Sequence, residues 1–294
     1  MSHDAAPSRL ILLGTAGGPT PKANRAPSAY ALVVGDETFV IDAGNGVGQQ
    51  LAKAKIGINS FRHVFLTHQH SDHSADMGTL ALLAWATNPS KPLTLWGPPP
   101  LKAMLKHFQA FAALDIKTRI ADEGRPPFES FVSIRELTKP GELLSEGGVR
   151  VRAALNAHPP LKHSFAYRFD TPDRSVVFSG DTTYSKSVVE LATGADLLVH
   201  EIMLPSALEP LIASEPNAKT LREHLYASHS TPEQVGRVAT EAGVKTLVLS
   251  HFVPGGAPLP DSVWHDAVRP YFSGTIVVGR DFLELPSSLQ NKTS

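Results

Sequence analysis

The sequence predicts an α/β protein, and three observations carry this prediction. Short apolar runs of the kind that form buried strands recur along the whole chain, beginning with LILLG at 10–14. Segments with a helical spacing of apolar residues alternate with them. No composition shift of the kind that marks a linker interrupts the 294 residues. A single domain over 1–294 is therefore expected.

The first half of the chain supplies strands and helices in turn. After the strand at 10–14, the runs YALVV and TFVIDAG flank Gly35-Asp36, which is the signal of a tight hairpin. The elements expected next are a short helix at 48–56, a buried strand at 63–68, a buried helix at 74–87, a strand at 92–97 and one long amphipathic helix at 100–120.

The second half of the chain also alternates expected strands and helices, but its sequence does not repeat that of the first half. Its expected strands are VRVRAALNAH (149–158), FAYRFD (165–170), SVVFSGD (175–181), DLLVHE (196–201) and TLVLSHF (246–252). A capping box at Thr231-Pro232-Glu233-Gln234 opens a helix that Gly243 ends. A helix at 262–272 and a strand at 275–285 complete the chain.

Composition excludes several classes of protein. The chain has no cysteine, so disulfides, cysteine-ligated zinc, iron–sulfur clusters and a catalytic thiol are excluded. Its 27 basic and 28 acidic residues give a net charge of −1, so nucleic-acid binding would need a local basic patch. No apolar run is long enough for a membrane span, and the N-terminus has no signal-peptide pattern. The cytoplasm is the expected location, without a membrane partner.

The strongest chemical signal is the run His68-Gln69-His70-Ser71-Asp72-His73, directly after the apolar run HVFLT. Imidazole and carboxylate groups are ligands of first-row metals, and a strand end holds them rigidly. Alternation along an extended segment points His68 and His70 the same way. Asp72 and His73 then turn toward a neighbouring point, which is the arrangement that two adjacent metals require.

This H-x-H-x-D-H run resembles the signature of the metallo-β-lactamase superfamily, and the resemblance extends along most of the chain. His158 follows one expected strand, Asp181 ends another and His251 lies at the end of TLVLSHF. Their order is similar to that of the remaining metal ligands of the family. The resemblance implies a four-layer αββα sandwich with the site at one edge of the packed sheets.

The resemblance also implies two divalent ions. Their ligands would be His68, His70 and His158 for one ion, Asp72, His73 and His251 for the other, and Asp181 as the bridge. Zinc is expected, with manganese or iron as alternatives because His/Asp sites accept all three. Two such ions activate water, and Asp72 can also orient its proton, so hydrolysis is expected. Asp42, at the end of FVIDAG, matches a position that supports the ligands in the family; a turn cap is the alternative.

A second pair of residues indicates the branch of the family. Glu201 ends DLLVHE, and His229 begins the run His-Ser-Thr before the capped helix. Ribonuclease Z-like enzymes have a matching pair, in which the histidine protonates the leaving oxygen. A carboxylate raises the pKa of an imidazole and fixes its tautomer. His163, His200 and His224 have no such context and are expected to be structural or on the surface.

Three further residues are candidates for substrate binding. The loop GTAGGPTPKANRAPSA is similar to the ribonuclease Z loop that recognises the RNA end, so Lys22 and Arg25 are expected to bind an anionic group. A solvated surface loop is the alternative. Tyr184 follows Asp181 closely and is expected to hydrogen-bond a substrate oxygen, as a tyrosine does in lactonases of the family.

The chain departs from ribonuclease Z at one point. Those enzymes carry a tRNA-gripping arm between the ligands matching His158 and Asp181, and only 22 residues separate them here. The compact form is similar to arylsulfatase-like hydrolases. The expected substrate is therefore a small sulfate ester, phosphodiester, carboxylic ester or lactone, with nucleic acid an unlikely partner. A ribonuclease Z-type tRNA 3′-processing endonuclease and a non-catalytic metal-binding module are the alternatives. Oligomeric state stays open, with a homodimer as one alternative.

Overall fold

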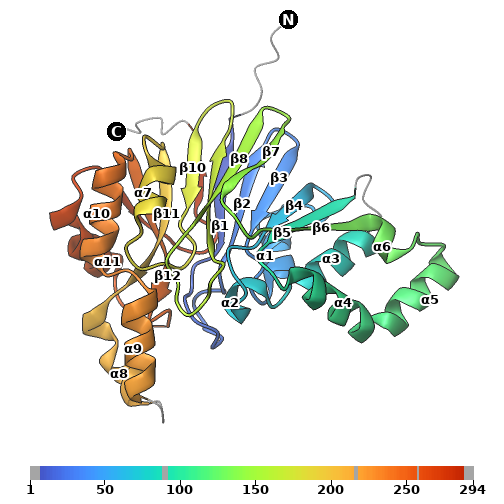
Figure 1. Cartoon of the computed structure of the whole chain (residues 1–294), viewed down its shortest axis with the longest axis horizontal. Coiled ribbons are helices and arrows are strands. Elements are labelled where there is room, and N and C mark those ends of the chain that lie inside the picture. The colour runs from blue at the N-terminus through green and yellow to red at the C-terminus, as the bar shows by residue number, and fades with distance from the viewer. Residues whose placement is uncertain (1–6, 88–91, 215–217, 257, 288–294) are drawn as a thin grey trace, which may run out of the picture.

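Two β-sheets face each other, and helices cover the outer side of each sheet (Figure 1). The computed structural model describes residues 7–87, 92–214, 218–256 and 258–287. Each sheet has seven strands within these ranges. This is the four-layer αββα sandwich of the metallo-β-lactamase fold, and the fold prediction is confirmed.

The first sheet is formed mainly by the N-terminal half and has the order β14-β1-β2-β3-β4-β5-β6. Its strands are β1 (Arg9–Gly14), β2 (Ala29–Val34), β3 (Glu37–Ile41), β4 (Phe61–Phe65), β5 (Leu93–Gly97), β6 (Val132–Glu136) and β14 (Glu284–Pro286). Strands β3 to β6 run parallel to one another. Their carboxyl ends therefore lie at one edge of the sheet, where ligands are bound in parallel sheets generally.

The second sheet has the order β13-β12-β11-β10-β9-β8-β7. Its strands are β7 (Gly141–Glu146), β8 (Val149–Leu155), β9 (Phe165–Asp170), β10 (Ser175–Phe178), β11 (Leu197–Met203), β12 (Thr246–Val253) and β13 (Thr275–Val278). Strands β10 to β13 are parallel. The apolar core between the two sheets is rich in aromatic rings, with Phe65 and Phe169 packed edge to face at 5.3 Å.

The helices form the two outer layers. Those of the first half are α1 (Val47–Lys53), α2 (Ser71–Ser74), α3 (Met77–Ala86), α4 (Leu101–Phe111), α5 (Ala113–Glu123) and α6 (Phe128–Phe131). Those of the second half are α7 (Lys186–Ala192), α8 (Glu209–Ala213), α9 (Ala218–Ser228), α10 (Pro232–Ala242) and α11 (Asp261–Val268). Helices α8 and α9 form an arm that projects from the second layer (Figure 1). Among the described residues, no helix combines the length and apolar character that crossing a bilayer requires.

Local signals in the sequence predicted their elements well. The hairpin of β2 and β3 turns at Gly35-Asp36, with Val34 paired to Glu37 and Gly35 at a positive φ of 58°. Helix α10 begins with the predicted capping box, in which Thr231 accepts a hydrogen bond from the amide of Gln234. These features depend on a few adjacent residues, so the sequence alone determines them.

Two long elements were predicted wrongly. The helix expected at 100–120 is two helices, α4 and α5, which meet at Ala112. The bend lets Ile116 and Ile120 return to the core of the first layer. The strand expected at 275–285 is divided between the sheets: after β13 the chain crosses over, and Leu285 in β14 pairs with Leu10 in β1. Both differences result from packing between elements that are distant in the sequence. The local spacing of apolar residues gives no information about that packing.

Replacing the capping threonine should destabilise the fold through α10. Thr231→Ala removes the acceptor for one helix-terminal amide, and we expect the free energy of unfolding to fall by about 1 kcal/mol. Urea unfolding followed by circular dichroism measures this change. Thr118→Ala is the control, because the exposed Thr118 hydroxyl donates to the Leu114 carbonyl within its own helix and, among the described residues, to no other group. An equal loss in both variants would contradict the capping role.

Candidate metal centre

The motif 68–73 lies just beyond the carboxyl end of β4, at the edge of the first sheet. His68 follows β4 by three residues, and His70 is extended with φ −64° and ψ 148°. Asp72 and His73 then lie in the single turn of α2. His68 and His70 belong to one group of candidate ligands, and Asp72 and His73 belong to a second.

The second sheet brings its own residues to the same edge. His158 follows β8, Asp181 follows β10, and His251 lies near the end of β12. All three side chains are at most 2% exposed. The two sheets thus meet at a seam that is lined by imidazole and carboxylate groups from both halves of the chain.

The first group of candidate ligands consists of His68, His70 and His158. The Nδ1 atom of His70 lies 3.1 Å from Nε2 of His68 and 3.1 Å from Nε2 of His158. His158 donates its Nδ1–H to the carbonyl of Ser228 at 2.9 Å, which leaves the Nε2 lone pair free. Burial lowers the pKa of His158 to about 4, which keeps the ring neutral.

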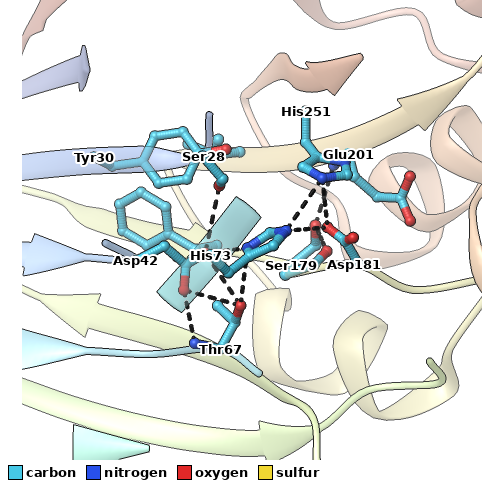
Figure 2. A pocket seen from close by; sticks show the side chains of 12 residues that line it. Ser28, Tyr30, Asp42, Thr67, His73, Ser179, Asp181, Glu201 and His251 are labelled. Atoms are coloured by element: carbon cyan, nitrogen blue, oxygen red, sulfur yellow. Dashed lines mark hydrogen bonds and ion pairs between the residues drawn. The ribbon is translucent and has the colours of Figure 1, made fainter. Parts of the chain in front are cut away.

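The second group consists of Asp72, His73, Asp181 and His251. Nε2 of His73 lies 3.1 Å from Nε2 of His251 and 3.3 Å from Oδ1 of Asp181 (Figure 2). Nε2 of His251 lies 3.3 Å from Oδ2 of Asp72. Burial alone would raise the pKa of Asp181, but the adjacent His251 and His73 hold it well below its usual range.

The Asp181 carboxylate lies between the two groups. Its Oδ1 atom is 3.3 Å from both His73 and His251, whereas its Oδ2 atom is 3.8 Å from Nε2 of His68. One oxygen therefore faces each group. This is the geometry that a bridging ligand between two ions needs.

Asp42 supports the site from behind. Its Oδ2 atom is 2.7 Å from Nδ1 of His73, and Oδ1 accepts a hydrogen bond from the Thr67 amide at 2.8 Å (Figure 2). A carboxylate at Nδ1 places the proton there and directs the Nε2 lone pair of His73 toward the centre. Asp42 thus positions a candidate ligand and does more than cap a turn.

The donor set fits divalent ions. Oδ1 of Asp181, which faces the second group, is buried without a hydrogen-bond partner among the described residues. The imidazole nitrogens that face one another at 3.1 Å are close to the separation of about 3.3 Å expected for ligands of a tetrahedral zinc. A cavity of about 10 Å³ lies beside them, next to Asp181 and His251. Nitrogen and oxygen donors without sulfur suit zinc, manganese or iron.

Glu201 and His229 form a buried pair beside the ligand groups. Nδ1 of His229 lies 3.0 Å and 3.1 Å from the two carboxylate oxygens of Glu201. Burial opposes a charge on His229, but Glu201 outweighs it and raises the pKa of His229 to about 9. The ring is 5.4 Å from that of His158 and 5.8 Å from that of His251. His229 can therefore reach a substrate that lies over both groups.

The three expected substrate-binding residues differ in position. Lys22 is partly exposed in the loop after β1, within electrostatic range of Asp72. Arg25 instead donates to the Gly279 carbonyl at 2.9 Å and stacks 4.2 Å above the Phe252 ring. The guanidinium is thus used within the fold, contrary to its expected role in anion binding.

Tyr184 also lies apart from the ligand groups. Its hydroxyl donates to Glu241 on α10 at 2.6 Å, and Arg237 of the same helix lies 4.3 Å above its ring. The side chain is held against the outer helical layer. The structure therefore does not bring Tyr184 to a substrate oxygen at the centre.

Sequence reasoning missed His224, which it assigned to the surface or the scaffold. The His224 ring on α9 lies 6.2 Å from His158, 6.1 Å from His229 and 6.3 Å from His70. No motif around His224 indicates this position. Its position depends on tertiary structure, because the packing of α9 places the His224 ring beside residues that are distant in the sequence.

Comparison with known proteins identifies the family of this chain. Residues 37–252 match the family described as beta-lactamase superfamily domain. Ribonuclease Z from Mycobacterium bovis (strain BCG / Pasteur 1173P2) is 32% identical over 275 residues, which cover 92% of this chain and 95% of the relative. The chain therefore belongs to the β-lactamase superfamily, as a hydrolase of the metallo-β-lactamase fold. Its near-full-length relatives are named ribonuclease Z.

Solved structures share the fold at lower identity. The metallo-β-lactamase fold protein YhfI from Bacillus subtilis has a TM-score of 0.70 and 23% identity, over 95% of this chain and 99% of YhfI. The short form of human tRNase Z also has a TM-score of 0.70, with 21% identity over 96% of this chain and 100% of that protein. At these identities the likeness concerns the fold alone.

The expectation of a small-molecule partner, with nucleic acid unlikely, is wrong. The relatives named ribonuclease Z from Mycobacterium bovis are matched over 95% of their own length. At this coverage, these relatives do not contain a large arm that is missing from this chain. The compact form therefore does not separate the chain from ribonuclease Z, and the inference drawn from the 22-residue spacing fails.

Removal of the bridging carboxylate should reduce metal binding. Asp181→Ala deletes the carboxylate that faces both groups, and we expect bound metal to fall from about two ions per chain to about one or fewer. Elemental analysis after gel filtration measures this, and Asp181→Asn tests the charge at constant shape. The exposed Asp266→Ala is the control. Unchanged stoichiometry in both Asp181 variants would refute the bridging role.

Proposed function

We propose that the chain is a ribonuclease Z-type endonuclease that cleaves the phosphodiester bond at the 3′ end of precursor tRNA. The observation that carries the proposal is the buried Glu201–His229 pair beside the two ligand groups. Relatives named ribonuclease Z over nearly the whole length support it, as does the fold shared with human tRNase Z.

The proposed metal ligands are those named from the sequence. His68, His70 and His158 would hold one zinc ion, Asp72, His73 and His251 the other, and Asp181 both. When bound, two such ions supply a nucleophile from water at neutral pH and stabilise the negative charge on the phosphodiester. Asp72 is the carboxylate that orients the proton of the attacking water.

His229 is the proposed acid. Its Nδ1–H is held by Glu201 at 3.0 Å, so protonation places the second proton on Nε2. Nε2–H then donates to the ribose oxygen that leaves, which departs poorly without a proton. Glu201 is fixed in turn by the Thr182 amide at 2.7 Å, and the pair is thereby held in one orientation.

The loop after β1 is the proposed contact with the RNA end. The Gly18 amide donates to Oδ2 of Asp72 at 2.9 Å, which fixes the loop beside the centre. Lys22 is a partly exposed cation of this loop; its ammonium donates to the Thr20 carbonyl and has further protons with which to pair with a phosphate. A local cation is sufficient here, so a net charge of −1 does not oppose RNA binding.

A precursor tRNA with a short 3′ trailer tests the function directly. We expect one endonucleolytic cut at the base of the trailer, resolved on a sequencing gel, and its loss on metal chelation. A DNA copy of the substrate and the Asp181→Asn variant are the controls. Cleavage of nitrophenyl esters without cleavage of the precursor, by metal-loaded protein, would contradict the proposal.

The role of His229 can be separated from that of the metals. We expect His229→Ala to keep its bound metal but to slow RNA cleavage by about 10²- to 10⁴-fold, because the ribose oxygen must leave unprotonated. A nitrophenyl phosphodiester, with a good leaving group, should be slowed much less. The half-exposed His265→Ala is the matched control. An equal slowdown on both substrates would rule out proton donation.

A further inference from the structure

His224 occupies the open side of the centre. Its ring lies between 6.1 and 6.3 Å from the rings of His70, His158 and His229. His158 and His229 are buried, whereas His70 and His224 are partly exposed. A substrate that reaches the ligand groups from solvent therefore passes these two partly exposed rings.

Ser228 holds His224 in a fixed relation to the centre. The carbonyl of Ser228 accepts from Nδ1 of His158 at 2.9 Å, and the Ser228 hydroxyl lies 3.2 Å from Nδ1 of His224. His229 is the next residue in the chain. One residue of the α8–α9 arm thus fixes the relative positions of three imidazoles.

The hydrogen bonds of Ser228 determine the tautomer of His224. Its hydroxyl is 2.6 Å from the Pro159 carbonyl, which can only accept, so Ser228 donates its single proton there. The hydroxyl can then only accept from His224, and Nδ1 of His224 carries the proton. Burial, together with the nearby His229, lowers the pKa of His224, which keeps the ring neutral.

The Nε2 atom of His224 is consequently a lone-pair acceptor. The contact with Ser228 is the only hydrogen bond of the His224 side chain among the described residues. A phosphodiester has no proton to donate to Nε2. In RNA, the ribose whose 3′ oxygen leaves carries a hydroxyl on the adjacent carbon, and this hydroxyl is a donor.

We propose that His224 accepts a hydrogen bond from the 2′-hydroxyl next to the leaving oxygen and thereby selects RNA over DNA. The inference rests on the proposed function. His229 faces the leaving 3′ oxygen and His224, with its ring 6.1 Å away, faces the vicinal oxygen. The two rings together recognise the pair of oxygens on one ribose.

A ribose-to-deoxyribose exchange at one nucleotide tests this inference. The substrates are an all-ribose precursor, the same precursor with a single 2′-deoxy nucleotide at the cleavage position, and one with the exchange one nucleotide upstream. The proteins are the wild type, His224→Leu, which removes the acceptor, and His224→Gln, which retains one. His107→Leu, at an exposed histidine of α4, is the control. The measurements are kcat/KM and the Kd of a non-cleavable methylphosphonate copy.

The wild type and His107→Leu should lose about 3- to 10-fold in kcat/KM and in affinity with the deoxy nucleotide at the cleavage position. His224→Leu should lose as much on the all-ribose precursor and show no further loss on the deoxy one. His224→Gln should recover part of the discrimination. An undiminished ribose-to-deoxyribose ratio in His224→Leu, or a ratio near one in the wild type, would overturn the inference alone. Failure of the wild type to cut the all-ribose precursor would overturn the proposed function and the inference with it.

Discussion

The burial of carboxylates without arginine or lysine partners is the constraint on which the rest of the site depends. Asp42, Asp72 and Asp181 are at most 6% exposed, and their ion pairs among the described residues are all with histidine. Removing a carboxylate from water costs several kcal/mol unless opposite charge is near. Burial opposes a charge on His73, but Asp181 and Asp42 outweigh it and raise the pKa of His73 well above its usual range, which shows how strongly the cluster favours added positive charge. Divalent ions at the two ligand groups satisfy this need, and they explain why Asp181 lies at the seam between the sheets.

Two of the four non-glycine residues with positive φ among the described residues lie at strand ends that carry these side chains. Asp42 and His251 adopt left-handed conformations, with φ of 58° and 42°. Such conformations cost a non-glycine residue about 1–3 kcal/mol. Asp42 is held in place by its bonds to Thr67 and His73. Gly180, with φ 58°, precedes Asp181 directly, and a Cβ there would lie 2.8 Å from a backbone oxygen. Sharp turns at strand ends thus position the ligands.

The range of the interactions decides how much could be predicted from the sequence. The motif 68–73 places its candidate ligands within six residues, so metal binding could be predicted from this segment alone. The partners across the seam were assigned only through resemblance to a family. The positions of Arg25, Tyr184 and His224 could not be predicted in this way, because contacts with distant residues determine them. In the fold, the bend at Ala112 is likewise set by packing against the core, whereas the capping box is local.

The same distinction explains the error over the substrate. The net charge and the spacing between two ligands are properties of the chain as a whole. Neither property identifies the side chains that contact the substrate. The site itself holds a buried acid pair, Glu201 and His229, directed at the ligand groups. A proton donor contributes most when the leaving group is poor. The ribose oxygen of RNA is such a leaving group, whereas an aryl sulfate releases a more acidic phenol that needs less help. The acid pair therefore favours a substrate with a poor leaving group, as in the proposed RNA, and the partly exposed His224 lies directly beside it.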